Sequence, residues 1–329
     1  MKIIEKTTEF ELTEDTAVAI GKFDGFHMGH QKLLHMVTEQ KAKGLAAAVF
    51  TFVPSPAAFF SKEAQQELTT IQEKRNIFEE AGVDYLIEYP FYQEIADMEP
   101  ETYIRKVLVE QLHAKCIVAG EDVSFGKKGM GNYRLLEQKS AEYGYQVIVI
   151  DKVQYQGREI SSTYVRDAVK QGEMELVTKL LGQPYHVGGT IVHGRHLGTG
   201  LGMPTVNILP PPEKLLPPNG VYYSYVMMNG RIYLGITNIG TKPTVSGEAV
   251  MGVETFIYDF DQDVYGQDIQ VYLLHYKRPE MRFHGIHWQE RKDFDFFFFH
   301  CVPPNKNRTI QMDCPVKSER EHPKILPSR

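Results

Sequence analysis

The sequence predicts an α/β chain in which a mostly parallel β-sheet, with helices on both faces, is followed by a small antiparallel β-barrel. Its 329 residues are about twice the length of a typical domain, which predicts two domains. The first half alternates short apolar runs with helical patterns, as parallel sheets with crossover helices do. After about Pro184, helical periodicity fades, and turn residues separate aromatic-rich strands as in small barrels.

Five buried strands are expected in the first half, each an apolar run bounded by turn residues. The run at 45–52 is almost entirely apolar and is followed by Pro54 and Pro56, which suits a strand buried on both faces. The expected strands are 16–20, 45–52, 83–89, 116–119 and 146–150. The helical stretches between them are 29–43, 70–81, 101–113 and 133–143. Because such sheets bind ligands beyond the carboxyl ends of their strands, we expect the site in the loops that follow these strands.

In the second half, a β-hairpin is expected from 221–226 and 232–234, because Asn229-Gly230 between them is typical of a tight turn. Further strands are expected at 253–258 and 269–276.

The change in composition near 182–185 predicts a domain boundary. We therefore expect one domain at 1–183 and a second at 184–283. Residues 284–329 show neither helical nor strand periodicity and contain five of the 18 prolines, so they are expected to belong to neither domain.

Composition and charge limit the partners. The formal net charge of -6, from 36 basic and 42 acidic residues, argues against binding to nucleic acid or to a membrane surface and leaves small molecules as the expected partners. No apolar run approaches the ~18 residues of a membrane helix, and the first residues lack an apolar signal region. Three widely spaced cysteines suit a reducing compartment, so we expect a cytoplasmic protein. The oligomeric state stays open.

The strongest chemical signal is the segment from Gly21 to His30, which reads Gly-Lys-Phe-Asp-Gly-Phe-His-Met-Gly-His between the first strand and the first helix. Glycine lets the backbone approach a ligand, and a helix N-terminus offers free N–H groups to phosphate. His27 and His30 lie at one helix entry, where both can stabilise charge that develops on a nucleotide phosphate. A surface histidine pair beside a turn glycine is the alternative, but the place directly after a buried strand favours the catalytic interpretation.

A second polar cluster lies at an expected helix start and consists of Ser161, Ser162, Thr163 and Arg166. Thr163 is expected to be the N-cap. Hydroxyls together with an arginine can hold the β- and γ-phosphates of ATP. A capping cluster with a solvated arginine is the alternative. Asp122, in a separate loop, suits a turn residue or a helix cap by its residue type alone.

These segments carry a resemblance to a known family. The segment Gly21–His30 resembles the HxGH motif of the nucleotidyltransferase superfamily, and its longer GxFDGxHxGH form is similar to that of the bacterial bifunctional riboflavin kinase/FMN adenylyltransferases, also called FAD synthetases. The further matching segments are 120–132, with Val123 where a phenylalanine is usual, 160–166, and 182–185, with Gln183 where arginine is common. The resemblance spans about 16–283.

For the first domain, the resemblance implies a Rossmann-like nucleotidyltransferase that joins FMN to the adenylyl group of ATP. His27 and His30 are its expected catalytic residues. The expected ATP and phosphate contacts in this domain are Gly21, Phe23, Asp24, Gly25, Gly29, Ser161, Ser162, Thr163 and Arg166. The expected flavin contacts are Asp122, Phe125 and Arg282.

For the second domain, the resemblance implies a riboflavin kinase. Pro204-Thr205-Val206-Asn207 is similar to the PTAN motif of these kinases, which implies that Thr205 and Asn207 help to place Mg²⁺ and ATP phosphates. Glu254 is the expected general base; it lies in an otherwise apolar strand, where a carboxylate is costly without a task or a partner. An outward-facing strand carboxylate is the alternative. The glycines expected beside ATP are Gly188, Gly194, Gly198 and Gly202.

The expected function is phosphorylation of riboflavin to FMN, and then adenylylation of FMN to FAD with release of pyrophosphate, with ATP as co-substrate and Mg²⁺ as the metal. Two alternatives stay open: an FMN adenylyltransferase with an impaired kinase barrel, and a flavin- or nucleotide-sensing binding protein. The first is motivated by the loss of helical periodicity after Phe283, where the family has a closing helix. A frame change in the coding sequence near Phe283 is one hypothesis for this tail, and resequencing tests it.

Overall fold

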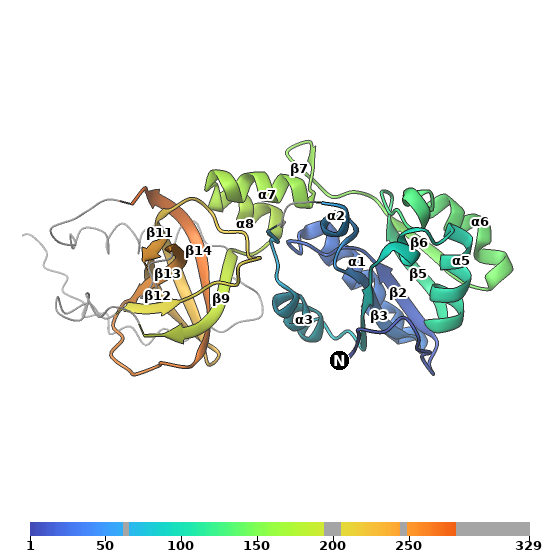
Figure 1. The fold of residues 1–329 in the computed structure, drawn as a ribbon, viewed down its shortest axis with the longest axis horizontal. Coiled ribbons are helices and arrows are strands. Elements are labelled where there is room, and N and C mark those ends of the chain that lie inside the picture. The colour runs from blue at the N-terminus through green and yellow to red at the C-terminus, as the bar shows by residue number, and fades with distance from the viewer. Residues whose placement is uncertain (62–65, 194–204, 244–248, 281–329) are drawn as a thin grey trace, which may run out of the picture.

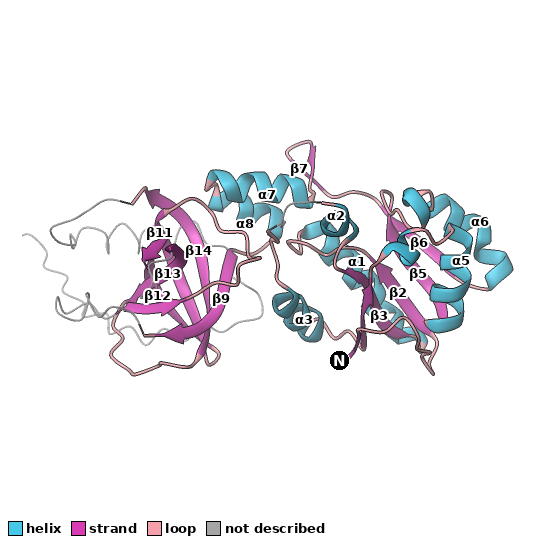
Figure 2. Cartoon of the chain, viewed as in Figure 1, coloured by secondary structure: helices cyan, strands magenta, loops and turns pink. Residues whose placement is uncertain are grey.

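The chain forms a parallel α/β domain and a closed β-barrel, joined by a pair of helices (Figure 1). The computed structural model describes residues 1–61, 66–193, 205–243 and 249–280. Among these residues, the helices lie in the α/β domain and in the connecting pair, whereas the barrel consists of strands and loops (Figure 2). The predicted fold class is therefore confirmed in both halves.

Six parallel strands form the N-terminal sheet, in the order β1-β4-β3-β2-β5-β6. The chain moves outward from β2 to β4 and then returns to the other side of β2 at β5, so the topological switch point lies between β2 and β5. The five predicted strands are confirmed, while the short and mostly exposed edge strand β1 was not predicted. The strands are β1 (Lys2–Glu5), β2 (Thr16–Ile20), β3 (Ala46–Val53), β4 (Tyr85–Pro90), β5 (Ala114–Gly120) and β6 (Gln146–Ile150).

Helices cover both faces of this sheet and confirm the four predicted helical stretches. They are α1 (Met28–Glu39), η1 (Gln40–Lys43), α2 (Pro56–Phe60), α3 (Ile71–Glu80), α4 (Gln93–Ala96), α5 (Pro100–Thr102), the π-helix η2 (Tyr103–Gln111), η3 (Lys127–Gly129) and α6 (Tyr133–Tyr143). Apolar side chains of α1 share one core with Ala17 and Ala19 of β2. Those of η2 share the opposite core with Val18 and Ile20. Side chains of a strand alternate between the two faces of the sheet, and here helices cover both faces, so every residue of β2 is buried.

The barrel closes in the order β10-β13-β12-β11-β14-β9, with all pairs antiparallel. The predicted hairpin is confirmed as β11 and β12, joined at Asn229 and Gly230. Both turn residues have positive φ, 50° and 73°, as a tight turn that matches strand twist requires. The strands are β9 (Tyr185–Val192), β10 (Thr205–Ile208), β11 (Gly220–Met228), β12 (Arg231–Pro243), β13 (Ala249–Ile257) and β14 (Asp268–Arg278).

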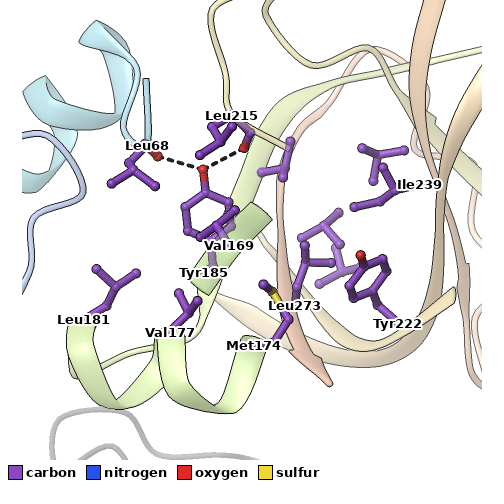
Figure 3. Close-up of a cluster of buried hydrophobic side chains, with 14 of the residues drawn as sticks. Leu68, Val169, Met174, Val177, Leu181, Tyr185, Leu215, Tyr222, Ile239 and Leu273 are labelled. Carbon is purple, nitrogen blue, oxygen red and sulfur yellow. Dashed lines mark hydrogen bonds between the residues drawn. The ribbon is translucent and has the colours of Figure 1, made fainter. Parts of the chain in front are cut away.

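Two helices, α7 (Ser162–Gln171) and α8 (Met174–Leu181), connect the domains and pack against the barrel. In Figure 3, Met174 and Val177 of α8 lie in one cluster with Tyr222 and Leu273 of the barrel. The apolar face of α8 is therefore buried by the barrel, which follows this helix in the sequence. The short hairpin of β7 (Gln154–Tyr155) and β8 (Arg158–Glu159) precedes α7.

The expected N-cap of α7 was wrong by two residues. Ser161 is the N-cap, and its Oγ accepts a hydrogen bond of 3.2 Å from the backbone N–H of Tyr164. Thr163 lies inside the first turn instead, because the helix already begins at Ser162 and three consecutive hydroxyl residues all suit the cap position.

Within the described residues, no helix has the length and apolar character that crossing a membrane requires.

The packing of α8 predicts that a change in this helix destabilises the barrel. Leu180 is fully buried in the shared core, so Leu180→Ala should cost about 2–5 kcal/mol in the free energy of unfolding. Hydrogen exchange at the amides of β11 and β14 should then accelerate. Lys179→Ala, at an exposed position of the same helix, is the matched control and should change the exchange little. Equal protection in both variants would contradict the shared core.

Candidate functional site

A cavity of about 450 Å³ lies at the carboxyl edge of the parallel sheet, beside the switch point between β2 and β5. Its walls come from loops that follow four strands: Gly21 and Lys22 after β2, Ser55 after β3, Asp122 after β5 and Asp151 after β6. This is the edge where the sequence predicted the site. Open α/β sheets bind their ligands at this position.

His27 and His30 lie together on the cavity wall at the start of α1. Their rings are stacked, with centroids 3.8 Å apart and planes 19° from parallel. The fully buried ring of Phe23 contacts His30, with 5.2 Å between centroids. Among the described residues, the Nδ1 atoms of both histidines are buried without a hydrogen-bond partner. Buried polar atoms are rarely left unpaired, so these two nitrogens are candidates for contact with a ligand.

Both histidines are neutral at physiological pH. Burial lowers the pKa of His27 to about 4, although the carboxylates of Asp122 and Asp24 oppose this shift. Burial, the neighbouring His27 and the ammonium of Lys74 hold the pKa of His30 well below its usual range. A neutral imidazole donates from one ring nitrogen and accepts at the other. The pair therefore offers N–H donors to a phosphate rather than fixed positive charge.

Glycines in the motif make room for this arrangement. A Cβ added at Gly29 would lie 3.2 Å from Cε1 and Nδ1 of His27. At Gly25, φ is +86° and a Cβ would lie only 2.8 Å from Cδ1 of Leu68. Gly21 and Gly29 line the cavity, whereas Gly25 is buried away from its wall. The sequence therefore correctly marked these glycines as positions of close approach, but only two of them face the candidate ligand space.

Asp24 is fully buried and joins the motif to two other segments. Its Oδ1 accepts hydrogen bonds from the backbone N–H groups of Leu68, at 2.8 Å, and Thr69, at 3.2 Å. Its Oδ2 pairs with the guanidinium of Arg166 at 2.5 Å, and Arg166 also donates to the carbonyl of Gln66 at 2.5 Å. Asp24 and Arg166 were predicted to contact phosphate. Together with Phe23, they lie outside the set of residues that line the cavity.

The hydroxyl cluster at the start of α7 reaches the cavity in part. Ser161 and Ser162 line it, and Ser162 Oγ donates to the backbone carbonyl of Asp24 at 2.8 Å. Thr163 is exposed and does not line it. Two of the three predicted hydroxyls therefore lie at a helix N-terminus beside the histidine pair, where free N–H groups favour anions.

The predicted flavin contacts separate in the structure. Asp122 lines the cavity. Phe125 is only 3% exposed and packs against Tyr103 with 5.1 Å between ring centroids, so it belongs to the core below the sheet and does not line the cavity. Arg282 lies outside the described residues.

A second site candidate lies in the barrel, on the adjacent strands β10 and β13. Thr205 Oγ1 donates to Glu254 Oε1 at 2.6 Å. Asn207, which is 7% exposed, lies opposite Glu254 in the ladder of these strands. The three residues predicted for metal binding and general base catalysis are thus brought together. Gly188 lies in β9, opposite Gln270, and the remaining predicted glycines, Gly194, Gly198 and Gly202, fall outside the described residues.

The donor set of this second group suits magnesium. Hydroxyl, amide and carboxylate oxygens are the ligands that Mg²⁺ prefers, and this ion usually keeps water and substrate phosphate as further ligands. Among the described residues, no group of three or more histidines, cysteines and carboxylates is arranged to hold a metal ion. A divalent ion at Thr205 and Asn207 would therefore be held jointly by the protein and the phosphates of ATP.

Sequence reasoning missed two lysines of the first cavity. Lys22 lines it, and its Nζ lies 3.7 Å from Oδ2 of Asp24. Lys152 lines it as well and donates to Glu159 at 2.8 Å. The signal was present, because each lysine follows a correctly predicted strand at its carboxyl end. The two ammonium groups bring positive charge to a cavity that the carboxylates of Asp122, Asp151 and Glu159 also line.

Comparison with family models divides the chain in two. A model described as FAD synthetase matches residues 9–164, and one described as riboflavin kinase matches residues 181–288. The residues between them, 165–180, fall mostly in α7 and α8.

Curated relatives match over most of the chain. A bifunctional riboflavin kinase/FMN adenylyltransferase of Listeria monocytogenes is 34% identical, covering 85% of this chain and 90% of the relative. Proteins of the same description from Bacillus subtilis and Escherichia coli K12 are 33% and 36% identical, covering 87% and 83% of this chain and 93% and 88% of the relatives. A solved structure described as a macrolide-efflux protein from Streptococcus pneumoniae is 27% identical, with a TM-score of 0.78 and coverage of 91% of this chain and 98% of its own.

The neutral histidine pair predicts a loss of stability in acid. In the unfolded chain His27 takes up a proton near pH 6.5, but in the folded chain only near pH 4. The unfolded state therefore binds more protons between these values, and the free energy of unfolding falls as the pH drops from about 6.5 to about 4. His27→Gln should remove up to ~3 kcal/mol of this fall, measured by urea unfolding at both pH values.

The matched control for this measurement is His35→Gln. The His35 side chain is 69% exposed and pairs with Glu39 on the surface of α1. Its removal should leave the pH dependence of unfolding nearly unchanged. If the wild-type chain and His27→Gln lose stability in parallel, the histidine is not buried in its neutral form.

Proposed function

This chain belongs to the family of bifunctional riboflavin kinase/FMN adenylyltransferases, and from that premise we propose which of its residues carry out each reaction. The enzyme phosphorylates riboflavin to FMN and adenylylates FMN to FAD, with ATP as the co-substrate of both reactions. The observation that carries the assignment is the stacked, neutral pair of His27 and His30 in a cavity at the switch point of the sheet.

Adenylyl transfer takes place in this cavity. A phosphate oxygen of FMN attacks the α-phosphorus of ATP, the bond from that phosphorus to the bridging oxygen of the β-phosphate breaks, and pyrophosphate leaves with the bonding electrons. Negative charge develops on the α-phosphate oxygens, and N–H groups of His27 and His30 donate to them. Donors that are already in place stabilise such charge without reorganisation at the moment of reaction. Their stacking and the burial of both Nδ1 atoms support this role, because the rings are held in place before the substrate binds.

Residues around the histidines bind the rest of the nucleotide. Ser161 and Ser162, at the N-terminus of α7, hold the leaving pyrophosphate together with Lys22 and Lys152. We assign Thr163 and Arg166 to the same group, although neither lines the cavity. Arg166 uses N–H groups of two terminal nitrogens on Gln66 and Asp24, and its remaining donors are available for phosphate. Asp122 and the loop around it form the flavin side of the cavity.

Riboflavin phosphorylation takes place in the barrel. Glu254 accepts the proton of the 5′-hydroxyl of riboflavin, the hydroxyl oxygen attacks the γ-phosphorus of ATP, and ADP leaves. The hydrogen bond from Thr205 fixes one oxygen of the Glu254 carboxylate, which supports its role as an oriented base. Thr205 and Asn207 would hold Mg²⁺, which when bound neutralises charge on the ATP phosphates.

We place the boundary between the modules at 182–185 and the cellular site of the enzyme in the cytoplasm. Helix α8 ends at Leu181, Gly182 follows with φ of 72° as its C-cap, and β9 begins at Tyr185. The modules are then 1–183 and 184–283, although the riboflavin kinase model continues to residue 288. The segment 284–329 lies outside the described residues.

Separate loss of the two activities tests the division of labour. His27→Ala should lower FAD formation from FMN and ATP by about 10²–10³-fold, because one donor to the transition state is lost. Formation of FMN from riboflavin should continue at the wild-type rate. Chromatography of the flavins formed with ATP and Mg²⁺ measures both activities in one experiment. Equal loss of both would contradict the assignment.

Glu254→Gln should have the reverse effect. The amide keeps the size of the side chain and can still accept from Thr205, but it cannot take the proton from riboflavin. FMN formation should therefore fall by about 10²–10⁴-fold. FAD formation from supplied FMN should be unaffected. Retained kinase activity in this variant would exclude Glu254 as the general base.

A further inference from the structure

One residue, Leu68, contacts both the histidine motif and the barrel. Its backbone N–H donates to Oδ1 of Asp24 at 2.8 Å, and its side chain packs against Gly25. Its carbonyl accepts hydrogen bonds from the hydroxyl of Tyr185, at 3.0 Å, and from Nζ of Lys214, at 2.8 Å. Figure 3 shows the Tyr185 hydroxyl between the carbonyls of Leu68 and Leu215. Leu68 belongs to the α/β domain, whereas both donors to its carbonyl belong to the second module.

Lys214 also makes a buried ion pair across the domain interface. It lies in the loop between β10 and β11, is 2% exposed, and its Nζ donates to both carboxylate oxygens of Glu73 in α3, at 2.9 and 2.7 Å. Nζ also lies 4.5 Å from the ring centroid of Tyr185. Burial raises the pKa of the Glu73 carboxyl, but Lys214 and His186 outweigh burial and hold this pKa below its usual value. Burial also lowers the pKa of Lys214, and the Glu73 carboxylate opposes this shift.

The backbone strengthens the same contact. The N–H of Leu215 donates to the carbonyl of Glu67 at 2.8 Å, and the N–H of Glu67 donates to the carbonyl of Glu213 at 2.5 Å. The barrel loop thus pairs with the segment 66–70 through a short parallel bridge between Glu67 and Lys214. Thr69, in that segment, accepts from the backbone N–H of Gly25 at 2.9 Å through its Oγ1. A single stretch of chain is therefore bound to the histidine motif on one side and to the barrel on the other.

A second contact lies on the other side of the motif. Gln31, the residue after His30, donates through Nε2 to the carbonyl of Leu181 at 2.6 Å. Leu181 ends α8, which is packed against the barrel. The segment that carries His27 and His30 is thus held at both ends by groups that the barrel positions.

We propose that Lys214 of the kinase module is a positioning residue for FMN adenylylation. The proposal rests on the function proposed above for His27 and His30. Without its ammonium group, the buried Glu73 loses its closest cationic partner and keeps only the N–H of Thr70 and the His186 ring, 3.6 Å away, and the Leu68 carbonyl loses a donor. The segment 66–70 then rearranges, and with it the partners of Asp24 and Gly25. Displacement of catalytic groups by about 1 Å is enough to reduce turnover about 100-fold.

The experiment compares Lys214→Met with the wild-type enzyme at full length. Methionine keeps much of the length of the lysine stem without its charge. The kcat of FAD formation from FMN and ATP is expected to fall between about 10- and 100-fold. The KM values for FMN and ATP should change less than threefold, since Lys214 itself does not line the cavity. Riboflavin phosphorylation should stay within about twofold, because Thr205 and Asn207 are held by the ladders of β9 and β13.

Arg75→Met is the matched control. Arg75 lies in helix α3, which also carries Glu73, the partner of Lys214. Its guanidinium pairs with Glu88 at 2.5 Å and with Glu5 at 2.7 Å. These ion pairs join α3 to β4 and β1, and among the described residues the side-chain hydrogen bonds of Arg75 go to Glu88 and Glu5 rather than to the segment 66–70 or the barrel. The variant should lower the melting temperature but leave the kcat of FAD formation within about twofold. A comparable fall in kcat for Arg75→Met would overturn the proposal, because general destabilisation would then explain both.

Tyr185→Phe provides the second variant, because removing one hydroxyl is milder than breaking an ion pair. Loss of its hydrogen bond to the Leu68 carbonyl should reduce the kcat of FAD formation about 2- to 10-fold, with kinase activity retained. If Lys214→Met does not fold, the kcat of FAD formation in Tyr185→Phe tests the proposal instead. Unchanged kcat in the folded variants, or equal loss of both activities, overturns the positioning role alone. Failure of the wild-type enzyme to convert FMN to FAD overturns the proposed function as well.

Discussion

The buried carboxylate of Asp24 is the interaction on which the arrangement of the first active site depends. It has no exposed surface and binds backbone N–H groups of one loop and the guanidinium of α7. Because an unpaired charge in this position would cost several kcal/mol, the three segments must come together in one arrangement or not at all. The motif turn, the segment 66–70 and the start of α7 therefore form one unit, and the histidines and serines that line the cavity project from it.

The two candidate sites differ in the charge of their central groups. The α/β cavity holds two stacked histidines that are neutral at physiological pH. In the mechanism proposed above, their N–H groups stabilise the additional negative charge that develops on the α-phosphate during attack. In the barrel, Thr205 donates to the Glu254 carboxylate, which suits the role proposed above for Glu254, the removal of a proton from an alcohol. Each environment suits one reaction and is poor for the other. In a chain with a net charge of -6, the groups proposed to bind phosphate lie at strand and helix ends rather than over a basic surface.

Periodicity and turn chemistry were sufficient to predict the sheet strands, the main helices and the barrel hairpin. Of the residues predicted for this site, His27, His30, Ser161 and Ser162 line one cavity at the edge where the carboxyl ends of the parallel strands meet, whereas Thr163 does not. What they did not reveal depends on contacts distant in sequence. Asp24 and Phe23 have the residue types of a ligand site, yet tertiary packing turns them inward. Lys214 resembles any loop lysine until its partner, 141 residues away, is known.

The packing of α7 and α8 has a consequence for the order of synthesis. These helices leave the ribosome well before β14, the strand that helps to bury their apolar side chains. About 100 residues must be added in the interval, which at typical elongation rates takes roughly 5–20 s. During that time the α/β domain can be folded while the apolar side chains of α7 and α8 are still exposed, because the barrel strands that bury them have not been synthesised. The nascent chain thus passes through a stage at which it needs shielding from aggregation, and a pause in translation after residue 181 would prolong that stage.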